Sequence, residues 1–232
     1  MSVTGIVAAL TAEARTLGPS VHGPTLDTLA DGNLIAISGM GPQAAARAAQ
    51  LLLAAGARHL LSFGLAGALD PHLAAGTVFL AESVLDEAGT AHPTCGPWRE
   101  RLARVAAARG SVARGVLLSV AQPLLSADAK AQARRNTGAA AVDMESFAIG
   151  AVAVRQGVDF AVARVVVDTA ADAVPRSVTA STGARGEVNY ARLIAAVLGA
   201  PQDLAALLRL SRRYRAAMAS LRFLGRQGVG PA

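Results

Sequence analysis

The sequence predicts an α/β fold in which a layered sheet is covered by helices on both faces. Short apolar runs alternate along the chain with alanine- and leucine-rich helical segments. Polar residues do not alternate with apolar ones inside these runs, which is typical of strands buried on both faces. No repeat or linker interrupts residues 1–200. A length of 232 residues suits one such domain, and 53% hydrophobic with 16% charged residues excludes disorder.

The first elements follow from apolar runs and turn residues. Residues 3–10 form an apolar run typical of a buried strand. The Asp-Gly-Asn sequence at 31–33 lies between two short β-like runs, the second at 35–38, and predicts a hairpin turn. Residues 43–55 are rich in alanine and leucine and are followed by Gly56, which predicts a helix and its end.

The middle of the chain continues the alternation. Residues 59–63 and 77–83 are predicted strands, and the first opens into a glycine cluster. Residues 98–108 form a helix with arginines on one face, stopped by Gly110, and 112–120 form another strand.

The last elements of the predicted domain surround a polar sequence. A short helix at 128–135 precedes a brief strand at 139–142, and a helix at 144–155 follows. Residues 159–167 are a β-branched strand, and Asp168 stands at its carboxyl end, where ligands of α/β sheets usually bind.

Composition excludes several classes of protein. Cys95 is the only cysteine, so a disulfide framework is excluded. The longest apolar run, at 60–69, is far shorter than the roughly 20 residues of a membrane span. The N-terminus lacks the basic region of a signal peptide, so we expect a cytoplasmic protein. The net charge of +6 lies almost wholly in residues 201–232, which favours an anionic surface as partner and, with few aromatic residues, no nucleic acid.

Two glycine clusters follow predicted strands. The amides of Gly39–Gly41 and Gly64–Gly67 can cradle an anion or a sugar, or the glycines can serve tight turns. Neither cluster has the spacing of a dinucleotide fingerprint or the lysine of a P-loop.

Three carboxylates lie at ends of elements that a layered sheet brings to one rim. They are Glu13, Glu145 and Asp168, and each also has a structural interpretation as a helix-end or strand-end residue. Arg164, inside a predicted buried strand, needs a buried carboxylate partner in either case.

The combination of these residues resembles the nucleoside phosphorylase and nucleosidase family. The resemblance runs from residue 5 to about residue 170 and includes the family's ribose motif and base motif. The matching segments are 5–13 (GIVAALTAE), 38–41 (SGMG), 63–67 (FGLAG) with Gly76, 141–146 (AVDMES) and 164–168 (RVVVD).

This resemblance implies a three-layer α/β/α sandwich with a central mixed sheet, and cleavage of the N-glycosidic bond of nucleosides. Asp168 then protonates or hydrogen-bonds N7 of the purine, and Glu13 activates the attacking water. Glu145 holds the ribose hydroxyls, with Met144 packed against the sugar. The remaining predicted binding residues are Asp143, Gly41, Gly64, Ala66 and Gly67.

The chain also departs from the family pattern. Val167 stands where the base motif has serine, and the phosphate region of the family's phosphorylases corresponds to Ser62 and Leu65. These departures and the presence of Glu13 favour water as the nucleophile. Inorganic phosphate is the alternative nucleophile and would then be a co-substrate. We expect no metal and no cofactor, and the resemblance implies a homo-oligomer.

Residues 201–232 are predicted to form a C-terminal extension to a catalytic domain at 1–200. Apolar residues recur at helical spacing between arginines, which predicts a basic amphipathic helix. The stripe consists of Leu204, Leu207, Leu208, Ser211, Tyr214, Met218 and Leu221. It packs either on the domain or a second subunit, or against an anionic membrane surface, which would place the protein at the inner membrane face.

A closer resemblance concerns the substrate. The segments 173–175 and 186–189 and the Arg/Leu-rich end are similar to the hopanoid-associated phosphorylases, which release adenine from adenosylhopane. The alternatives are a methylthioadenosine/adenosylhomocysteine nucleosidase or a purine nucleoside phosphorylase acting on small soluble nucleosides, and a non-catalytic nucleoside-binding module. The three carboxylates disfavour the last.

Overall fold

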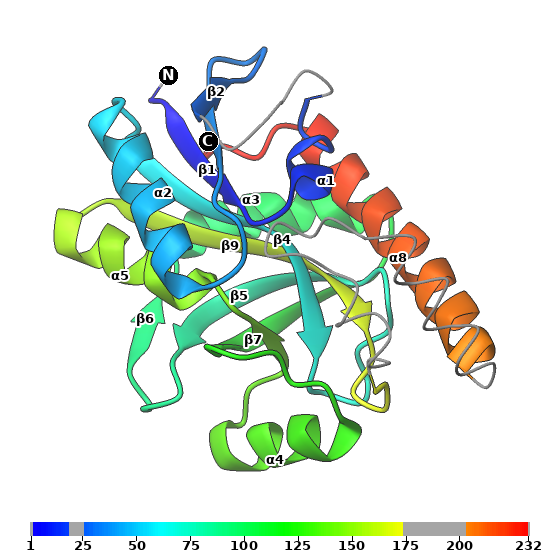
Figure 1. The fold of residues 1–232 in the computed structure, drawn as a ribbon. Helices are drawn as coiled ribbons and strands as arrows, with labels where there is room; N and C mark the ends of the chain where they lie inside the picture. Colours follow the sequence, from blue (N-terminus) through cyan, green and yellow to red (C-terminus); the bar gives the residue numbers. More distant parts are fainter. Residues whose placement is uncertain (1, 19–25, 174–202, 232) are drawn as a thin grey trace.

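The computed structural model describes residues 2–18, 26–173 and 203–231, and its strands form one mixed sheet (Figure 1). The strands are β1 (Thr4–Ala8), β2 (Leu26–Thr28), β3 (Leu34–Ile37), β4 (His59–Ala68), β5 (Val78–Leu85), β6 (Ala91–Pro93), β7 (Val112–Ser119), β8 (Ala141–Asp143) and β9 (Asp159–Asp168). The helices are α1 (Thr11–Ala14), α2 (Pro42–Ala54), α3 (Gly96–Ala107), α4 (Ala127–Thr137), α5 (Ser146–Gln156) and α8 (Asp203–Arg226).

The sheet follows the order β2-β3-β1-β4-β8-β7-β5-β6, and β9 pairs with both β4 and β5. Consequently β4, β9, β5, β7 and β8 pair in a closed cycle, from which β1, β3 and β2 extend as an open sheet. The predicted hairpin between β2 and β3 is present as an antiparallel pair. Parallel pairing of β1 with β3 and β4, and of β4 with β9, directs the carboxyl ends of these strands to one edge.

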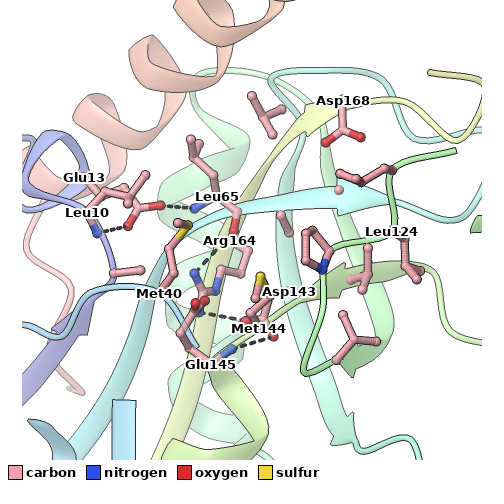
Figure 2. Close-up of a pocket in the computed structure, with 18 of the residues that line it drawn as sticks. Leu10, Glu13, Met40, Leu65, Leu124, Asp143, Met144, Glu145, Arg164 and Asp168 are labelled. Carbon is pink, nitrogen blue, oxygen red and sulfur yellow. Dashed lines mark hydrogen bonds and ion pairs between the residues drawn. The ribbon is translucent and has the colours of Figure 1, made fainter. Parts of the chain in front are cut away.

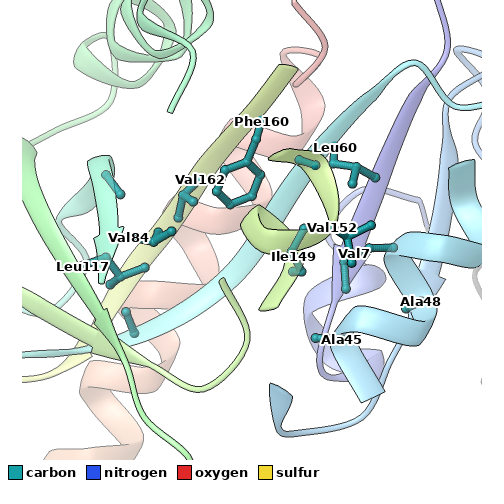
Figure 3. Packing of buried hydrophobic residues seen from close by; sticks show 14 of the residues in the cluster. Val7, Ala45, Ala48, Leu60, Val84, Leu117, Ile149, Val152, Phe160 and Val162 are labelled. Atoms are coloured by element: carbon teal, nitrogen blue, oxygen red, sulfur yellow. The ribbon is translucent and has the colours of Figure 1, made fainter. Parts of the chain in front are cut away.

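One face of the sheet packs against α2 and α5. Alternate residues of each strand point to this face, as Val7 of β1 and Leu60 of β4 do. They meet small residues of α2, such as Ala45 and Ala48, and Ile149 of α5 (Figure 3). Because alanines line α2, this helix can approach the sheet and α5 closely.

The opposite face packs against α1, α3 and α8. Ile6 and Leu61, the neighbours of the residues just named, belong to this second core with Trp98 of α3. Leu221 and Leu224 of α8 are fully buried in the same core. Helices on both faces confirm the predicted α/β/α layers.

The predicted amphipathic stripe of the C-terminal helix divides into two parts. Met218 and Leu221 are buried, whereas Leu208 and Tyr214 are 55% and 38% exposed. The second half of α8 therefore packs on the domain, and the following residues are fixed by the Trp98 indole N–H, which donates to the carbonyl of Val229 at 2.8 Å. The side chains of 204 and 207 and the segments 174–175 and 186–189 lie outside the described residues.

Two elements differ from the expectation. β4 runs from His59 to Ala68, so the glycine cluster that was expected to follow a strand lies inside one. Pairing with β9 on one side and with β1 and β8 on the other outweighs the low strand propensity of glycine. Residues 91–93 form the edge strand β6, which was not predicted, and Pro93 is tolerated there because an edge strand has no neighbour on one side.

Candidate active site

A pocket of about 280 Å³ lies at the carboxyl edge of the sheet, beyond the ends of β1, β8 and β9 (Figure 2). Three predicted catalytic or ribose-binding carboxylates, Glu13, Glu145 and Asp168, line it. Most of the other lining residues are apolar: Ala9, Leu10, Met40, Leu65, Ala66, Val120, Pro123, Leu124, Leu125, Val142, Met144 and Val167. The pocket thus places a few ionisable groups in an apolar cavity, as ligand sites commonly do.

Glu13 is held at both carboxylate oxygens. It lies in the short helix α1 after β1 and is 2% exposed. Oε2 accepts the backbone N–H of Leu10 at 2.9 Å, and Oε1 accepts that of Leu65 at 2.9 Å. Burial raises the pKa of Glu13 more than the charge of Arg164 and these hydrogen bonds lower it. The result is a fixed carboxyl group of increased basicity at the pocket wall.

Arg164 is the centre of a buried polar cluster. Its Nη2 lies 2.7 Å from Oδ2 of Asp143 and 3.4 Å from Oε2 of Glu145, and it donates to Oγ of Ser62 at 2.8 Å. The predicted need of this arginine for a buried carboxylate partner is therefore confirmed. Asp143 is further held by short hydrogen bonds from the hydroxyls of Ser119 and Ser146.

Glu145 connects this cluster to the loop before α2. It is the residue before α5, and its Oε1 accepts the backbone N–H of Gly41 at 3.0 Å. Burial raises the pKa of Glu145 from 4.5 to about 7, against the opposing charge of Arg164. A group with this pKa changes charge near neutral pH, so the charge on this wall depends on pH.

Asp168 lies apart from these groups at the end of β9 (Figure 2). Its Oδ2 accepts a short charge-assisted hydrogen bond from Nζ of Lys130, a residue of α4. Burial raises the pKa of Asp168 more than the Lys130 ammonium lowers it. Lys130 lines the pocket and contacts Asp168, and sequence reasoning did not single it out as a site residue. The one signal was composition, since it is the only lysine among 22 basic residues.

The predicted binding residues occupy different positions. Met144, Ala66, Gly67 and Asp143 line the pocket. Gly41 and Gly64 do not line it. Gly41 binds Glu145, and a Cβ at Gly64 would lie 2.6 Å from Oε1 of Glu13 and 2.8 Å from Nη1 of Arg164. Glycine at position 64 thus allows Glu13 and Arg164 to approach the strand.

Comparison with known proteins identifies the family of this fold. Residues 28–200 match the model of the phosphorylase superfamily, which is more than half of the chain. The chain belongs to the phosphorylase superfamily. A search of curated proteins found no match.

Solved structures of nucleosidases share the fold at low sequence identity. The 5′-methylthioadenosine/S-adenosylhomocysteine nucleosidase of Neisseria meningitidis is 18% identical, with a TM-score of 0.73 over 97% of this chain and 96% of that one. The Helicobacter pylori nucleosidase with 5′-methylthioadenosine in its active site is 16% identical (TM-score 0.71, 98% and 100% covered). Futalosine hydrolase of Helicobacter pylori is 18% identical (0.69, 98% and 98%).

Membership of this superfamily confirms the predicted family and the prediction of an enzyme that cleaves the N-glycosidic bond of nucleosides. The roles of individual residues, the hopanoid branch and the homo-oligomer stay predictions. Among the described residues, no helix is long and apolar enough to cross a membrane, and no three His, Cys, Asp or Glu side chains are grouped to hold a metal ion.

Proposed function

We propose that this enzyme hydrolyses an adenosine-type nucleoside and releases adenine, and that its substrate is adenosylhopane. The observation that carries the proposal is the separation of ionisable groups within one apolar pocket. Glu13, Glu145 and Arg164 lie together, and Asp168 lies apart from them (Figure 2). Asp168 is paired there with Lys130. A nucleoside needs two such regions, one for the sugar and one for the base.

The chemistry assigns a role to each region. When the N-glycosidic bond breaks, positive charge develops on the ribose and negative charge on the purine. Glu145, fixed by Gly41, accepts hydrogen bonds from the ribose hydroxyls and stabilises the positive charge. Asp168 gives its proton to N7 of the purine, and the raised pKa of this carboxyl keeps it protonated at higher pH than an exposed aspartate. Glu13 takes a proton from the attacking water.

The charges of the pocket support water over phosphate as the nucleophile. With Asp168 protonated as the acid, its described lining residues include three other carboxylates and two cations, a formal net charge of −1. Both cations are already paired, Arg164 with Asp143 and Glu145, and Lys130 with Asp168. A phosphate ion would have to displace these partners or bind against a negative field. Water has no such requirement.

The size and mouth of the pocket support a bulky apolar 5′ group. A cavity of about 280 Å³ lies at the lower end of ligand-binding cavities, so it suits a nucleoside and little more. Met40 and Leu125 belong to its lining and are 40% and 37% exposed, so the apolar lining continues to the surface. A lipid attached at C5′ would leave the pocket along such side chains.

A membrane contact through the first half of α8 would bring the enzyme to a lipid substrate. Leu208 and Tyr214 are exposed there, and Arg209, Arg212 and Arg215 are exposed around them. Each arginine near an anionic leaflet contributes about 1 kcal/mol. The R209E/R212E variant should lose sedimentation with phosphatidylglycerol vesicles at low salt. The matched control R222E/R226E carries the same charge change on the second half of α8 and should still sediment with the vesicles. An equal loss of sedimentation in both variants, or no binding by the unmodified protein, would contradict the membrane contact.

A small soluble nucleoside is the second candidate. Structures of methylthioadenosine/adenosylhomocysteine nucleosidases are among the neighbours, and the apolar lining suits a methylthio group as well as a lipid. The two candidates share the chemistry and differ in the 5′ group.

One experiment separates these possibilities. Adenine release is measured with adenosine, 5′-methylthioadenosine and a 5′-alkyl adenosine of long chain, each with and without phosphate. We expect the highest kcat/KM for the long-chain substrate, a free sugar as product and no acceleration by phosphate. A preference for methylthioadenosine would favour the second candidate, a sugar 1-phosphate would overturn hydrolysis, and no release of adenine from any of them would overturn the proposed function.

A further inference from the structure

Lys130 is the only lysine of the chain and is almost completely buried, with 1% of its surface exposed. It lies in the second turn of α4, whose N-terminus is capped by the hydroxyl of Ser126, which accepts the N–H of Ala129 at 3.1 Å. Burying an ammonium group costs several kcal/mol even when it is paired, and an apolar residue of similar size usually replaces such a pair without loss of stability. Stability alone therefore gives no reason for a lysine here.

The contacts of Lys130 are both made with the end of β9. Its Nζ donates to Oδ2 of Asp168 and to the carbonyl of Thr169, the latter at 2.9 Å. Within the described part of the chain, Oδ1 of Asp168 accepts no hydrogen bond. The carboxyl group lies against Gly67, where an added Cβ would be 3.2 Å from Oδ1 and 3.5 Å from Oδ2. Gly67 and Asp168 both line the pocket. Lys130 thus binds one oxygen of a carboxyl group at the pocket wall and leaves the other oxygen available for a further hydrogen bond.

We propose that Lys130 is the positioning residue of the acid and holds Asp168 with Oδ1 toward the purine. Because its ammonium group lies against Oδ2, it also favours loss of the proton from Asp168. This inference rests on the proposed function. As the bond between C1′ and N9 breaks, its electron pair passes to the purine, and the proton moves from Oδ1 to N7. Asp168 is left as a carboxylate beside the Lys130 ammonium, which stabilises it, and a proton from solvent restores the acid.

Other charged groups near Asp168 act less directly. Asp172 follows in the next loop and accepts hydrogen bonds from the backbone N–H and hydroxyl of Thr169, both at 2.7 Å. Arg213 of α8 forms an ion pair with Asp172. The charge of Asp172 raises the pKa of Asp168 and the charge of Arg213 lowers it, so the effects of these two residues on the pKa of Asp168 oppose each other. Lys130 is the cation in direct contact.

The kinetic test uses K130M and K130R, with R134M as the matched control. Arg134 is one turn along α4 and pairs with Asp70 at 2.7 Å, away from Asp168. The pH dependence of kcat/KM is measured with 5′-methylthioadenosine and with the corresponding 4-nitrophenyl riboside, whose leaving group needs no proton. In K130M the loss of the cation should move the alkaline limb for the nucleoside upward by about one pH unit or more. K130R keeps a charge and should keep the limb near that of the unmodified enzyme, as should R134M.

The two substrates distinguish positioning from folding. In K130M the plateau value of kcat/KM for the nucleoside should fall by about tenfold or more, which is less than the full contribution of a positioned acid. The nitrophenyl riboside should be cleaved nearly as fast as by the unmodified enzyme. An alkaline limb that stays in place in K130M, or an equal loss with both substrates, would overturn the role of Lys130. An unmodified enzyme that cleaves neither these two substrates nor the long-chain 5′-alkyl adenosine would instead overturn the proposed function.

A spectroscopic measurement tests the pair without catalysis. With one lysine in the chain, protein labelled with [¹³Cε]lysine gives a single side-chain signal in a tag-free preparation. This signal should move as Asp168 titrates, and D168N should remove that step. Adenine should shift the signal in the unmodified protein. A signal that is the same in D168N at every pH would show that the pair does not form and would overturn the inference.

Discussion

Replacing Glu145 by glutamine should stabilise the folded protein above neutral pH while it lowers activity. The carboxyl group is 5% exposed, and burial raises its pKa from 4.5 to about 7 despite the charge of Arg164. A carboxyl whose pKa is higher in the folded than in the unfolded state favours folding while it is protonated. That contribution is complete below pH 4.5 and is lost as the pH rises from 4.5 through about 7.

The magnitude follows from the difference between the two pKa values. At about 1.4 kcal/mol per pH unit, a rise from 4.5 to about 7 corresponds to about 3 kcal/mol. For a protein of this size, that free energy corresponds to about 6–12 °C in Tm. Glutamine is neutral at every pH, so E145Q lacks this loss. The unfolding free energy of the unmodified protein should therefore fall by about 3 kcal/mol more than that of E145Q between pH 4 and pH 8.

Urea unfolding measures this difference, and the protein supplies its own probe. Trp98 is the only tryptophan and is 1% exposed in the core, so its fluorescence reports unfolding. The control is E100Q, which removes a carboxylate from a largely exposed ion pair with Arg114. Its stability should follow the pH dependence of the unmodified protein. If the curves of E145Q and the unmodified protein run parallel, the environment assigned to Glu145 is wrong.

Further variants address the other carboxylates and the C-terminal helix. D168N should reduce adenine release by about 100-fold or more, because it removes the proton donor; near-normal turnover would contradict the assignment. E13Q should abolish hydrolysis and lower the free energy of unfolding by about 1–3 kcal/mol. The side-chain NH₂ of glutamine would face one of the two backbone N–H groups that donate to Glu13, and that N–H would lose its acceptor. Unchanged hydrolysis without phosphate would refute the base role. G64A should lower both stability and activity by displacing Glu13, as measured by Tm and kcat. Deletion of residues 201–232 should give an insoluble or unfolded protein, because Leu221 and Leu224 are core residues; a soluble, active truncation would refute this.

The sequence was most informative where a pattern is local. Apolar runs predicted the strands, and the alternation of Ile6 and Val7 between the two cores follows from the period of a strand. The need of Arg164 for carboxylates follows from the cost of burying a charge, which applies in any fold. Such inferences require no knowledge of how distant segments meet.

Features that depend on distant segments could not be predicted in this way. Lys130 and Asp168 are 38 residues apart and lie on different elements, so no spacing connects them. The C-terminal stripe is uniform in sequence, yet the sheet covers Leu221 and leaves Leu208 exposed. Gly64 looks like a loop residue, and only its contact with Glu13 and Arg164 explains a glycine within a strand.

The distribution of charge in the pocket matches the direction in which electrons move during the proposed reaction. On the sugar side, Glu13, Asp143 and Glu145 surround a single cation, Arg164, so this side has a formal excess of negative charge. On the base side, Asp168 is neutral while it holds the proton, so the positive charge of Lys130 beside it is not balanced. The field of these fixed charges therefore favours positive charge on the ribose and electron density on the purine, which is the charge distribution of the transition state. Since Glu145 ionises at a pH of about 7, this asymmetry strengthens as the pH rises through neutrality, until Asp168 loses the proton that the purine requires.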